Sequence, residues 1–168
     1  MKSKISKPVI ILGLVSLFTD IASEMLYPVT PIFLTAVLGS SMAVVGVIEG
    51  IAEVTAGLLK GYFGNLSDKL GKRSIFVVIG YGVSALVKPL PGIIQNVPAV
   101  LFSRVSDRVG KGIRTAPRDA LLASYSHGNS GAVFGFHRAM DTLGAAVGPV
   151  IALVLLYFFP DNFQLIFL

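Results

Sequence analysis

Long apolar segments recur along this chain, each about the length needed to cross a bilayer. Turn-forming residues separate five of them, at about residues 8–38, 42–63, 74–95, 98–124 and 132–159, and a sixth begins at about residue 162. A transmembrane helix needs about 20 apolar residues, so the first five segments qualify, and the sixth, FQLIFL, has only begun when the sequence stops. With 54% hydrophobic and 14% charged residues, the chain has too little polar sequence to cover a soluble domain of 168 residues. The sequence therefore predicts one all-α domain over residues 1–168, a polytopic bundle of transmembrane helices.

Basic residues at alternate ends of these segments predict the orientation of the bundle. They are Lys2, Lys4, Lys7, Lys69, Lys72, Arg73, Arg114 and Arg118. The opposite turns, around residues 40, 96 and 161, contain no Lys or Arg. Because cytoplasmic loops carry an excess of bases, we expect a multi-pass protein of the cell (inner or plasma) membrane with a cytoplasmic N-terminus. Lys88 is an exception near the outer end of its segment, where it would snorkel outward or face a cavity.

Several classes of protein are excluded by what the sequence lacks. The net charge of +5 does not form one exposed basic stripe, which argues against a nucleic-acid partner. There is no cysteine for a disulfide, a zinc–thiolate site or a nucleophile. The GKG at 110–112 lacks the upstream Gly and the following Ser or Thr of a phosphate-binding loop, and no zinc-binding His spacing or nucleophilic Ser elbow is present. We therefore expect no enzyme, no metal and no cofactor.

Ionisable residues at membrane depth are the candidates for function, because each is costly to hold there. Asp20 and Glu24 lie four residues apart on one helix face, with no base near them on their own segment. Two adjacent carboxylates oppose each other's ionisation, which suits reversible protonation. We predict that they face a substrate or proton pathway. Further candidates for this pathway are Arg104, Arg108, His137, Arg138 and Asp141.

A structural role is the alternative for some of these charges. Arg138 is expected to pair with Asp141, and Asp107 with its basic neighbours. His137 would either relay protons or hold a helix end. For Glu49 and Glu53 the structural role is favoured, because Glu53 shares its face with a stripe of small residues suited to close helix contact. The stripe consists of Gly46, Gly50, Gly57, Gly61 and Gly64.

The charged stretch GNLSDKLGKR, residues 64–73, resembles the signature between the second and third helices of major facilitator superfamily transporters. The matching residues are Gly64, Asp68, Lys69, Gly71, Lys72 and Arg73. LFSRVSDRVGKGIRTAPRDA resembles the fourth helix of the family, an Arg followed by a Gly-rich run, with Arg104 favoured as that Arg and Arg108 as the alternative. FTDIASEMLYP with RVGKGIRTAPRDAL resembles a bacterial and archaeal subgroup of poorly defined substrate.

A further stretch, GAAVGPVIAL, resembles the fifth-helix motif of proton-coupled efflux members. Gly144, Gly148 and Pro149 match it, and Ala152–Leu153 stands where a closing pair of glycines is usual. The two glycines would allow close helix approach, and Pro149 would fix a bend.

The resemblance implies the N-terminal half of a fold with two six-helix halves, truncated here in helix six, with substrate bound at the midplane between the halves. The implied function is secondary transport by alternating access, with proton-coupled efflux of a small molecule favoured. The alternative is a non-transporting membrane subunit, or a remnant of a split or truncated transporter. The implied partners are the lipid bilayer, a small-molecule substrate, protons and the missing C-terminal six-helix half.

The resemblance also assigns the 64–73 stretch to a conformational latch. Asp68 would meet a helix N-terminus in the missing half, where the positive end of that helix favours a carboxylate. Lys72 would reach an acid at the inner end of the fourth segment, Asp119 or, second, Asp107. Arg104 would face the cavity.

Overall fold

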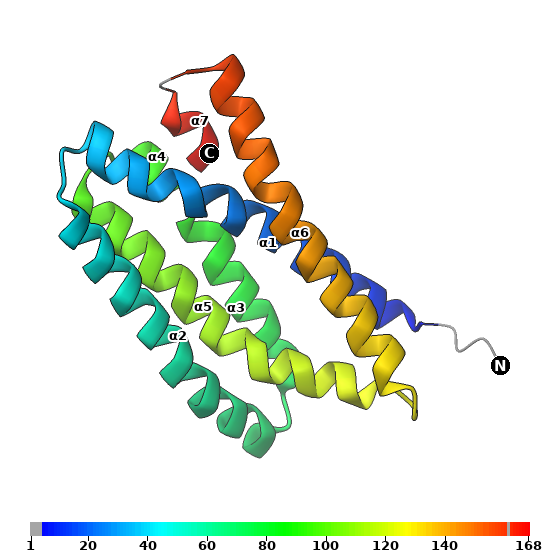
Figure 1. Ribbon diagram of the computed structural model, residues 1–168. Helices are drawn as coiled ribbons and strands as arrows, with labels where there is room; N and C mark the ends of the chain where they lie inside the picture. Colours follow the sequence, from blue (N-terminus) through cyan, green and yellow to red (C-terminus); the bar gives the residue numbers. More distant parts are fainter. Residues whose placement is uncertain (1–4, 161) are drawn as a thin grey trace.

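The computed structural model describes residues 5–160 and 162–168, and within them the chain is helical with short turns (Figure 1). Its elements are α1 (Lys7–Ile32), the π-helical η1 (Phe33–Val37), α2 (Met42–Leu70), α3 (Arg73–Val87), α4 (Leu90–Ile93), α5 (Val97–Ser124), α6 (Ser130–Phe158) and α7 (Phe163–Phe167). The predicted all-α fold is confirmed. Lys2 and Lys4, which were used to predict the orientation, lie outside the described residues.

Four helical segments of the described chain are long and apolar enough to cross a membrane. They are Lys7–Val37, Met42–Leu70, Arg73–Ile93 and Ser130–Phe158. The 28-residue α5 is long enough but is not one of them, because charged residues are spread along its length. Its role as a fifth span, predicted over residues 98–124, stays a prediction.

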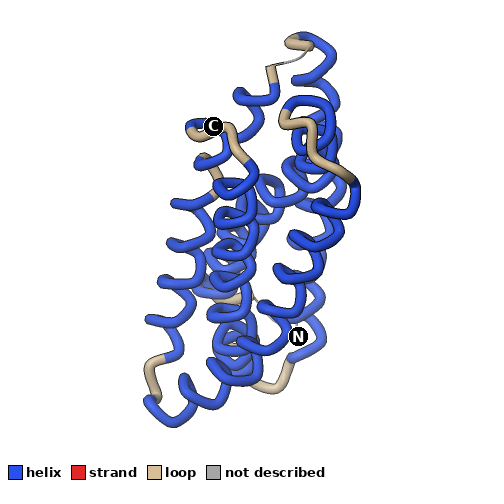
Figure 2. Tube along the Cα trace, turned by 90° about the vertical axis from the view of Figure 1, so that its left-hand side faces the viewer, coloured by secondary structure: helices blue, strands red, loops and turns tan. Residues whose placement is uncertain are grey.

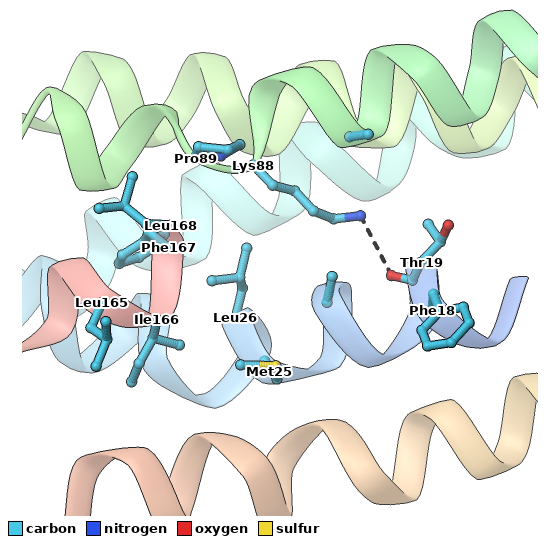
Figure 3. Close-up of a pocket in the computed structure, with 12 residues that line it drawn as sticks. Phe18, Thr19, Met25, Leu26, Lys88, Pro89, Leu165, Ile166, Phe167 and Leu168 are labelled. Atoms are coloured by element: carbon cyan, nitrogen blue, oxygen red, sulfur yellow. Dashed lines mark hydrogen bonds between the residues drawn. The ribbon is translucent and has the colours of Figure 1, made fainter. Parts of the chain in front are cut away.

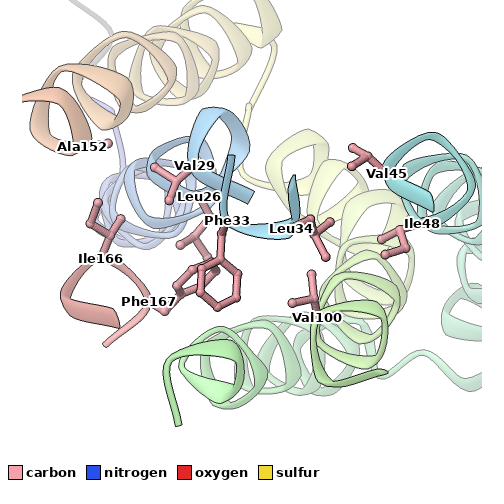
Figure 4. Close-up of a cluster of buried hydrophobic side chains, with 10 residues drawn as sticks. All are labelled: Leu26, Val29, Phe33, Leu34, Val45, Ile48, Val100, Ala152, Ile166 and Phe167. Carbon is pink, nitrogen blue, oxygen red and sulfur yellow. The ribbon is translucent and has the colours of Figure 1, made fainter. Parts of the chain in front are cut away.

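The long helices lie in two groups, which Figures 1 and 2 show from two directions. In one group α1 packs along α6, and in the other α5 lies between α2 and α3. Where the end of α1, η1, α2, α5 and α7 converge, buried apolar side chains form the main core, which includes Phe33, Leu34, Ile48, Val100 and Phe167 (Figure 4). The outward faces of the helices carry many exposed apolar side chains, as expected of surfaces that meet lipid.

Close helix crossings occur at glycines other than those of the predicted stripe. Gly80 of α3 and Gly110 of α5 meet so closely that a Cβ added to either would lie 2.6 Å from the carbonyl oxygen of the other. On the opposite side of α5, a Cβ on Gly112 would lie 2.7 Å from the Cβ of Leu59 in α2. Since Gly110 and Gly112 lie two residues apart, they point to different sides of α5 and admit one neighbouring helix each.

Most glycines of the predicted stripe of α2 contact no other helix of the described chain. A Cβ added to Gly46, Gly50, Gly57 or Gly61 would meet nothing within 4 Å among the described residues. Gly64 is the exception, since its added Cβ would lie 2.9 Å from the Cβ of Ala116. The stripe faces away from α5 because the carboxylates of Glu49 and Glu53, together with Ile48 and Ala52, set the face that α2 turns toward the bundle.

The start of the 64–73 stretch is helix and not loop. α2 was predicted to end near residue 63 but continues to Leu70, so Gly64, Asp68 and Lys69 lie in its last turns. Gly71, at φ +64°, ends the helix in the left-handed conformation that glycine adopts without steric cost. α3 begins at Arg73, so the connection is a tight turn.

Candidate functional site

A cavity of about 320 Å³, lined mostly by charged side chains, lies among α1, α5 and α6. We call it the charged cavity. Its charged lining residues are Asp20 and Glu24 of α1, Lys111, Arg114 and Arg118 of α5, and Arg138 and Asp141 of α6. The structure thus brings together four residues that the sequence predicted for a substrate or proton pathway: Asp20, Glu24, Arg138 and Asp141.

Two glycines of α6 set the position of the carboxylates of α1. A Cβ added to Gly144 would lie 3.0 Å from the Cβ of Asp20, and one added to Gly148 would lie 3.0 Å from the Cβ of Glu24. The backbones cross closely here, because those added atoms would also lie 2.9 and 2.6 Å from carbonyl oxygens of α1. Gly144 and Gly148 therefore let α6 approach the face of α1 that carries the two carboxylates, which lie one helical turn apart beside the cavity.

Three basic residues of α5 form the opposite wall of the cavity. Two of them, Arg114 and Arg118, served in the sequence analysis only to predict the orientation of the bundle in the membrane. Arg114 donates a 2.7 Å hydrogen bond to the Ser84 hydroxyl, and its guanidinium carbon lies 4.4 Å from the Tyr81 ring centroid. Arg118 pairs with Asp119 at 3.0 Å. The spacing of Lys111, Arg114 and Arg118 places them on one helix face, and this spacing was a signal that could have identified the wall.

Asp141 is paired differently from the prediction. Among the described residues no ion pair joins it to Arg138; its Oδ1 lies 3.3 Å from His137 Nδ1, and its Oδ2 lies 4.0 Å from Arg118 Nη1. The i,i+4 position of His137 puts the imidazole on the same face as Asp141, whereas Arg138 extends to the exposed side of α6. His137 is buried, and its Nε2 has no hydrogen-bond partner within the described chain.

Arg104 and Arg108 are held by α2 and do not line the charged cavity. Arg104 makes a bidentate contact with Glu49, with N–O distances of 2.8 and 2.7 Å, and Arg108 lies 2.8 Å from Glu53. Glu49 and Glu53 are four residues apart on α2, and Arg104 and Arg108 are four apart on α5, so the two ion pairs lie one turn apart between helices that run parallel. The structural role favoured for Glu49 and Glu53 agrees with these contacts, whereas the expectation that Arg104 faces the cavity does not.

Asp107 pairs across helices and not with the bases of its own helix. Lys88 Nζ lies 3.3 Å from Asp107 Oδ1, and both side chains are less than 10% exposed, at 9% and 5%. The ammonium also approaches the carbonyl oxygen of Thr19 in α1 at 3.5 Å (Figure 3). Lys88 therefore ties α3 to α5 and α1; it reaches inward along the edge of an apolar pocket of about 440 Å³ and does not snorkel outward.

Comparison with known proteins identifies the family of this bundle. The family model described as Major Facilitator Superfamily matches residues 12–168, nearly the whole chain. The chain belongs to the major facilitator superfamily. The resemblance noted in the sequence is thereby confirmed, and the chain is part of a membrane transporter family and not an enzyme.

Curated relatives within the superfamily are longer than this chain. An uncharacterized MFS-type transporter of Methanocaldococcus jannaschii is 40% identical over 166 residues, which cover 98% of this chain and 41% of that protein. Uncharacterized proteins of Mycobacterium tuberculosis and Mycobacterium bovis are each 32% identical over 143 residues, 84% of this chain and 35% of theirs. The chain thus spans about two fifths, or less, of the length of the curated relatives it matches.

The 64–73 stretch makes a local ion pair in this structure. Asp68 and Arg73 meet at 2.7 Å across the Gly71 turn, with side chains 56% and 38% exposed. No ion pair of the described residues includes Lys72, and Asp119 contacts Arg118 instead. The predicted contact between Lys72 and Asp119 is not formed in this conformation, in which Arg118 contacts that carboxylate and the second candidate, Asp107, is paired with Lys88. The latch, which makes and breaks its contacts between states, stays a prediction.

Proposed function

We propose that this chain is the N-terminal half of a secondary transporter that exports a small molecule in exchange for protons, by alternating access. The observation that carries the proposal is the charged cavity. In it the carboxylates of Asp20 and Glu24 face a wall of bases at the side of the bundle where α1, α5 and α6 meet. Ionisable groups held at membrane depth are costly and mark substrate or ion pathways.

In the proposed cycle Asp20 and Glu24 alternate between a protonated and an ionised state. Ionised, they bind the substrate within the charged cavity. A proton arriving from the other side neutralises one carboxylate, weakens the hold on the substrate and completes the exchange. His137 and Asp141 would pass that proton, since their side chains lie 3.3 Å apart and Asp141 lines the cavity.

The conformational latch at 64–73 is a second part of the proposal. Asp68, on the last turn of α2, would contact a helix N-terminus of the C-terminal half in one state and lose that contact in the other. Its pairing with Arg73 is exposed and contributes little to stability. An Asp68→Asn variant should therefore keep its melting temperature and shift the balance between inward- and outward-open states. The balance is measured by the accessibility of single cysteines introduced on each side of the membrane, since the chain has none of its own. Unchanged accessibility would refute the latch.

A non-transporting membrane subunit or remnant is the second candidate function. A downstream reading frame that encodes six more transmembrane helices would argue for the transporter, and a genome without such a frame would argue for the remnant.

Transport by the full-length protein in proteoliposomes, with an imposed pH gradient and a pH-sensitive dye inside, tests the proposed exchange. A library of small solutes is screened for those that release protons into the lumen. We expect solute-dependent proton flux that is lost in Asp20→Asn and Glu24→Gln and kept in Lys60→Gln, which removes an exposed charge of α2 away from the cavity. Solute flux that does not depend on the pH gradient would refute proton coupling, as would unchanged coupling in both Asp20→Asn and Glu24→Gln.

A further inference from the structure

The acidic and basic side chains of the charged cavity come mostly from different helices. α1 contributes two acids, Asp20 and Glu24, and α5 contributes three bases, Lys111, Arg114 and Arg118. α6 contributes one of each kind, Arg138 and Asp141. A solute in this cavity therefore meets negative charge on one side and positive charge on the other.

Some of these charges already have partners in the protein, and others do not. Arg114 is held by Ser84 and Tyr81, and Arg118 by Asp119. In contrast, no hydrogen bond or ion pair joins the side chains of four cavity residues to any other residue that the structure describes. The four are Asp20 and Glu24 of α1, Lys111 of α5 and Arg138 of α6.

We propose that the charged cavity binds a zwitterionic solute whose cationic group contacts Asp20 and Glu24 and whose anionic group contacts Lys111 and Arg138. This inference rests on the proposed function and adds the substrate class to it. The volume of about 320 Å³ lies at the low end of the range for ligand pockets, which suits a compact solute.

Solutes of other charge fit the two walls less well. A plain anion would satisfy the bases of α5 but would face the carboxylates of Asp20 and Glu24 without a counter-charge. A plain cation would satisfy those carboxylates but would face three bases. A neutral apolar solute would remove water from the charges of both walls and supply no hydrogen bond in return. Only a solute with both charges compensates both walls.

The same geometry explains why protons and substrate would exchange. The cationic group of the solute and a proton compete for the same two carboxylates, since a protonated Asp20 or Glu24 no longer attracts a cation. Binding of one therefore weakens binding of the other, and this reciprocal effect is the requirement for exchange at a single site. A solute with an anionic group alone would instead bind more tightly after protonation and travel in the same direction as the proton.

A matched set of probes tests the substrate class by binding alone. The full-length protein in detergent is heated with 4-aminobutyrate, butyrate or n-butylammonium, which share a four-carbon skeleton and differ in charge. At about 50 mM, a ligand that dissociates in the millimolar range raises the melting temperature measurably, because it binds only the folded state. We expect 4-aminobutyrate to raise it and the two singly charged probes to do so far less.

Paired variants should change which probe binds. Asp20→Asn/Glu24→Gln should weaken 4-aminobutyrate about tenfold or more and improve butyrate, whereas Lys111→Gln/Arg138→Gln should weaken it similarly and improve n-butylammonium. Lys60→Gln is the control and should bind like the unmodified protein. Butyrate or n-butylammonium binding the unmodified protein as well as 4-aminobutyrate does, or no stabilisation by any probe, would overturn the substrate class. Because no gradient is used, proton-coupled flux measured separately in proteoliposomes would still support the proposed function after such a failure.

Discussion

The crossing of α1 and α6 makes a sharp prediction about a single methyl group. In Gly148→Ala the new Cβ would lie 2.6 Å from the carbonyl oxygen of Ile21 and 3.0 Å from the amide nitrogen of Met25. Favourable contacts lie near 3.5–4.0 Å, so the methyl is about 1 Å too close to backbone atoms that cannot rotate away. The two helices must therefore separate by several tenths of an ångström along the wall that carries Glu24.

The magnitude follows from two opposing effects. Forcing a methyl group into a packed contact costs about 1–3 kcal/mol, and replacing Gly by Ala within a helix returns about 1 kcal/mol. We expect Gly148→Ala to lower the free energy of unfolding by up to about 2 kcal/mol. Gly135→Ala, on the same helix, is the matched control: its Cβ would meet nothing within 4 Å among the described residues, so the change should be neutral or slightly stabilising.

Unfolding in mild detergent, followed by circular dichroism at 222 nm, measures both variants, since the chain contains no tryptophan for fluorescence. The double variant Gly144→Ala/Gly148→Ala tests the reasoning further. If one separation of α1 from α6 relieves both clashes, the combined loss should be smaller than the sum of the single losses. Equal effects of Gly148→Ala and Gly135→Ala would refute the argument, and strictly additive losses would refute the shared separation.

Two further predictions concern the ion pairs of α5. Lys88→Met should lower the free energy of unfolding by about 3 kcal/mol, because it leaves the buried carboxylate of Asp107 without its partner. The double variant Lys88→Met/Asp107→Leu should recover most of this loss. A double variant as unstable as the single one would show that the two residues are not coupled. In a double-mutant cycle measured by chemical unfolding, Arg104→Gln and Glu49→Gln should couple by about 1–2 kcal/mol, because the contact is bidentate and Arg104 is buried. A coupling energy near zero would mean that the contact between Arg104 and Glu49 does not contribute to stability.

The sequence predicted the helical class well because the apolar segments leave few alternatives, and α1, α3 and α6 occupy the segments expected for them. It placed the end of α2 too early. The charged residues of 64–73 were interpreted as the end of the helix. Asp68 and Lys69 are compatible with a helix that continues beyond the apolar region, and only Gly71 requires the chain to turn.

The candidate site was predicted in part, and the misses have a common physical cause. Periodicity along one helix identified Asp20 and Glu24 on a shared face, which needs no knowledge of other helices. It could not determine which charges meet across helices, so Asp107 was assigned to neighbours in sequence although its partner, Lys88, directly follows the end of α3. Which charges pair depends on how neighbouring helices are aligned along their lengths, and this alignment cannot be read from the periodicity of a single sequence.

The charges of α5 also bear on how this protein enters the bilayer. Arg104, Asp107 and Arg108 would each cost about 2.5–3.5 kcal/mol at the centre of an isolated inserting helix, so α5 alone would partition poorly. Their partners in this structure, Glu49, Glu53 and Lys88, all precede them in the chain. During synthesis α2 and α3 therefore leave the ribosome first, and they present the counter-charges before α5 arrives. Insertion of α5, the predicted span over residues 98–124, would then be an assembly step between two helices that make few contacts with each other, and loss of an acid in α2 would first impair that insertion.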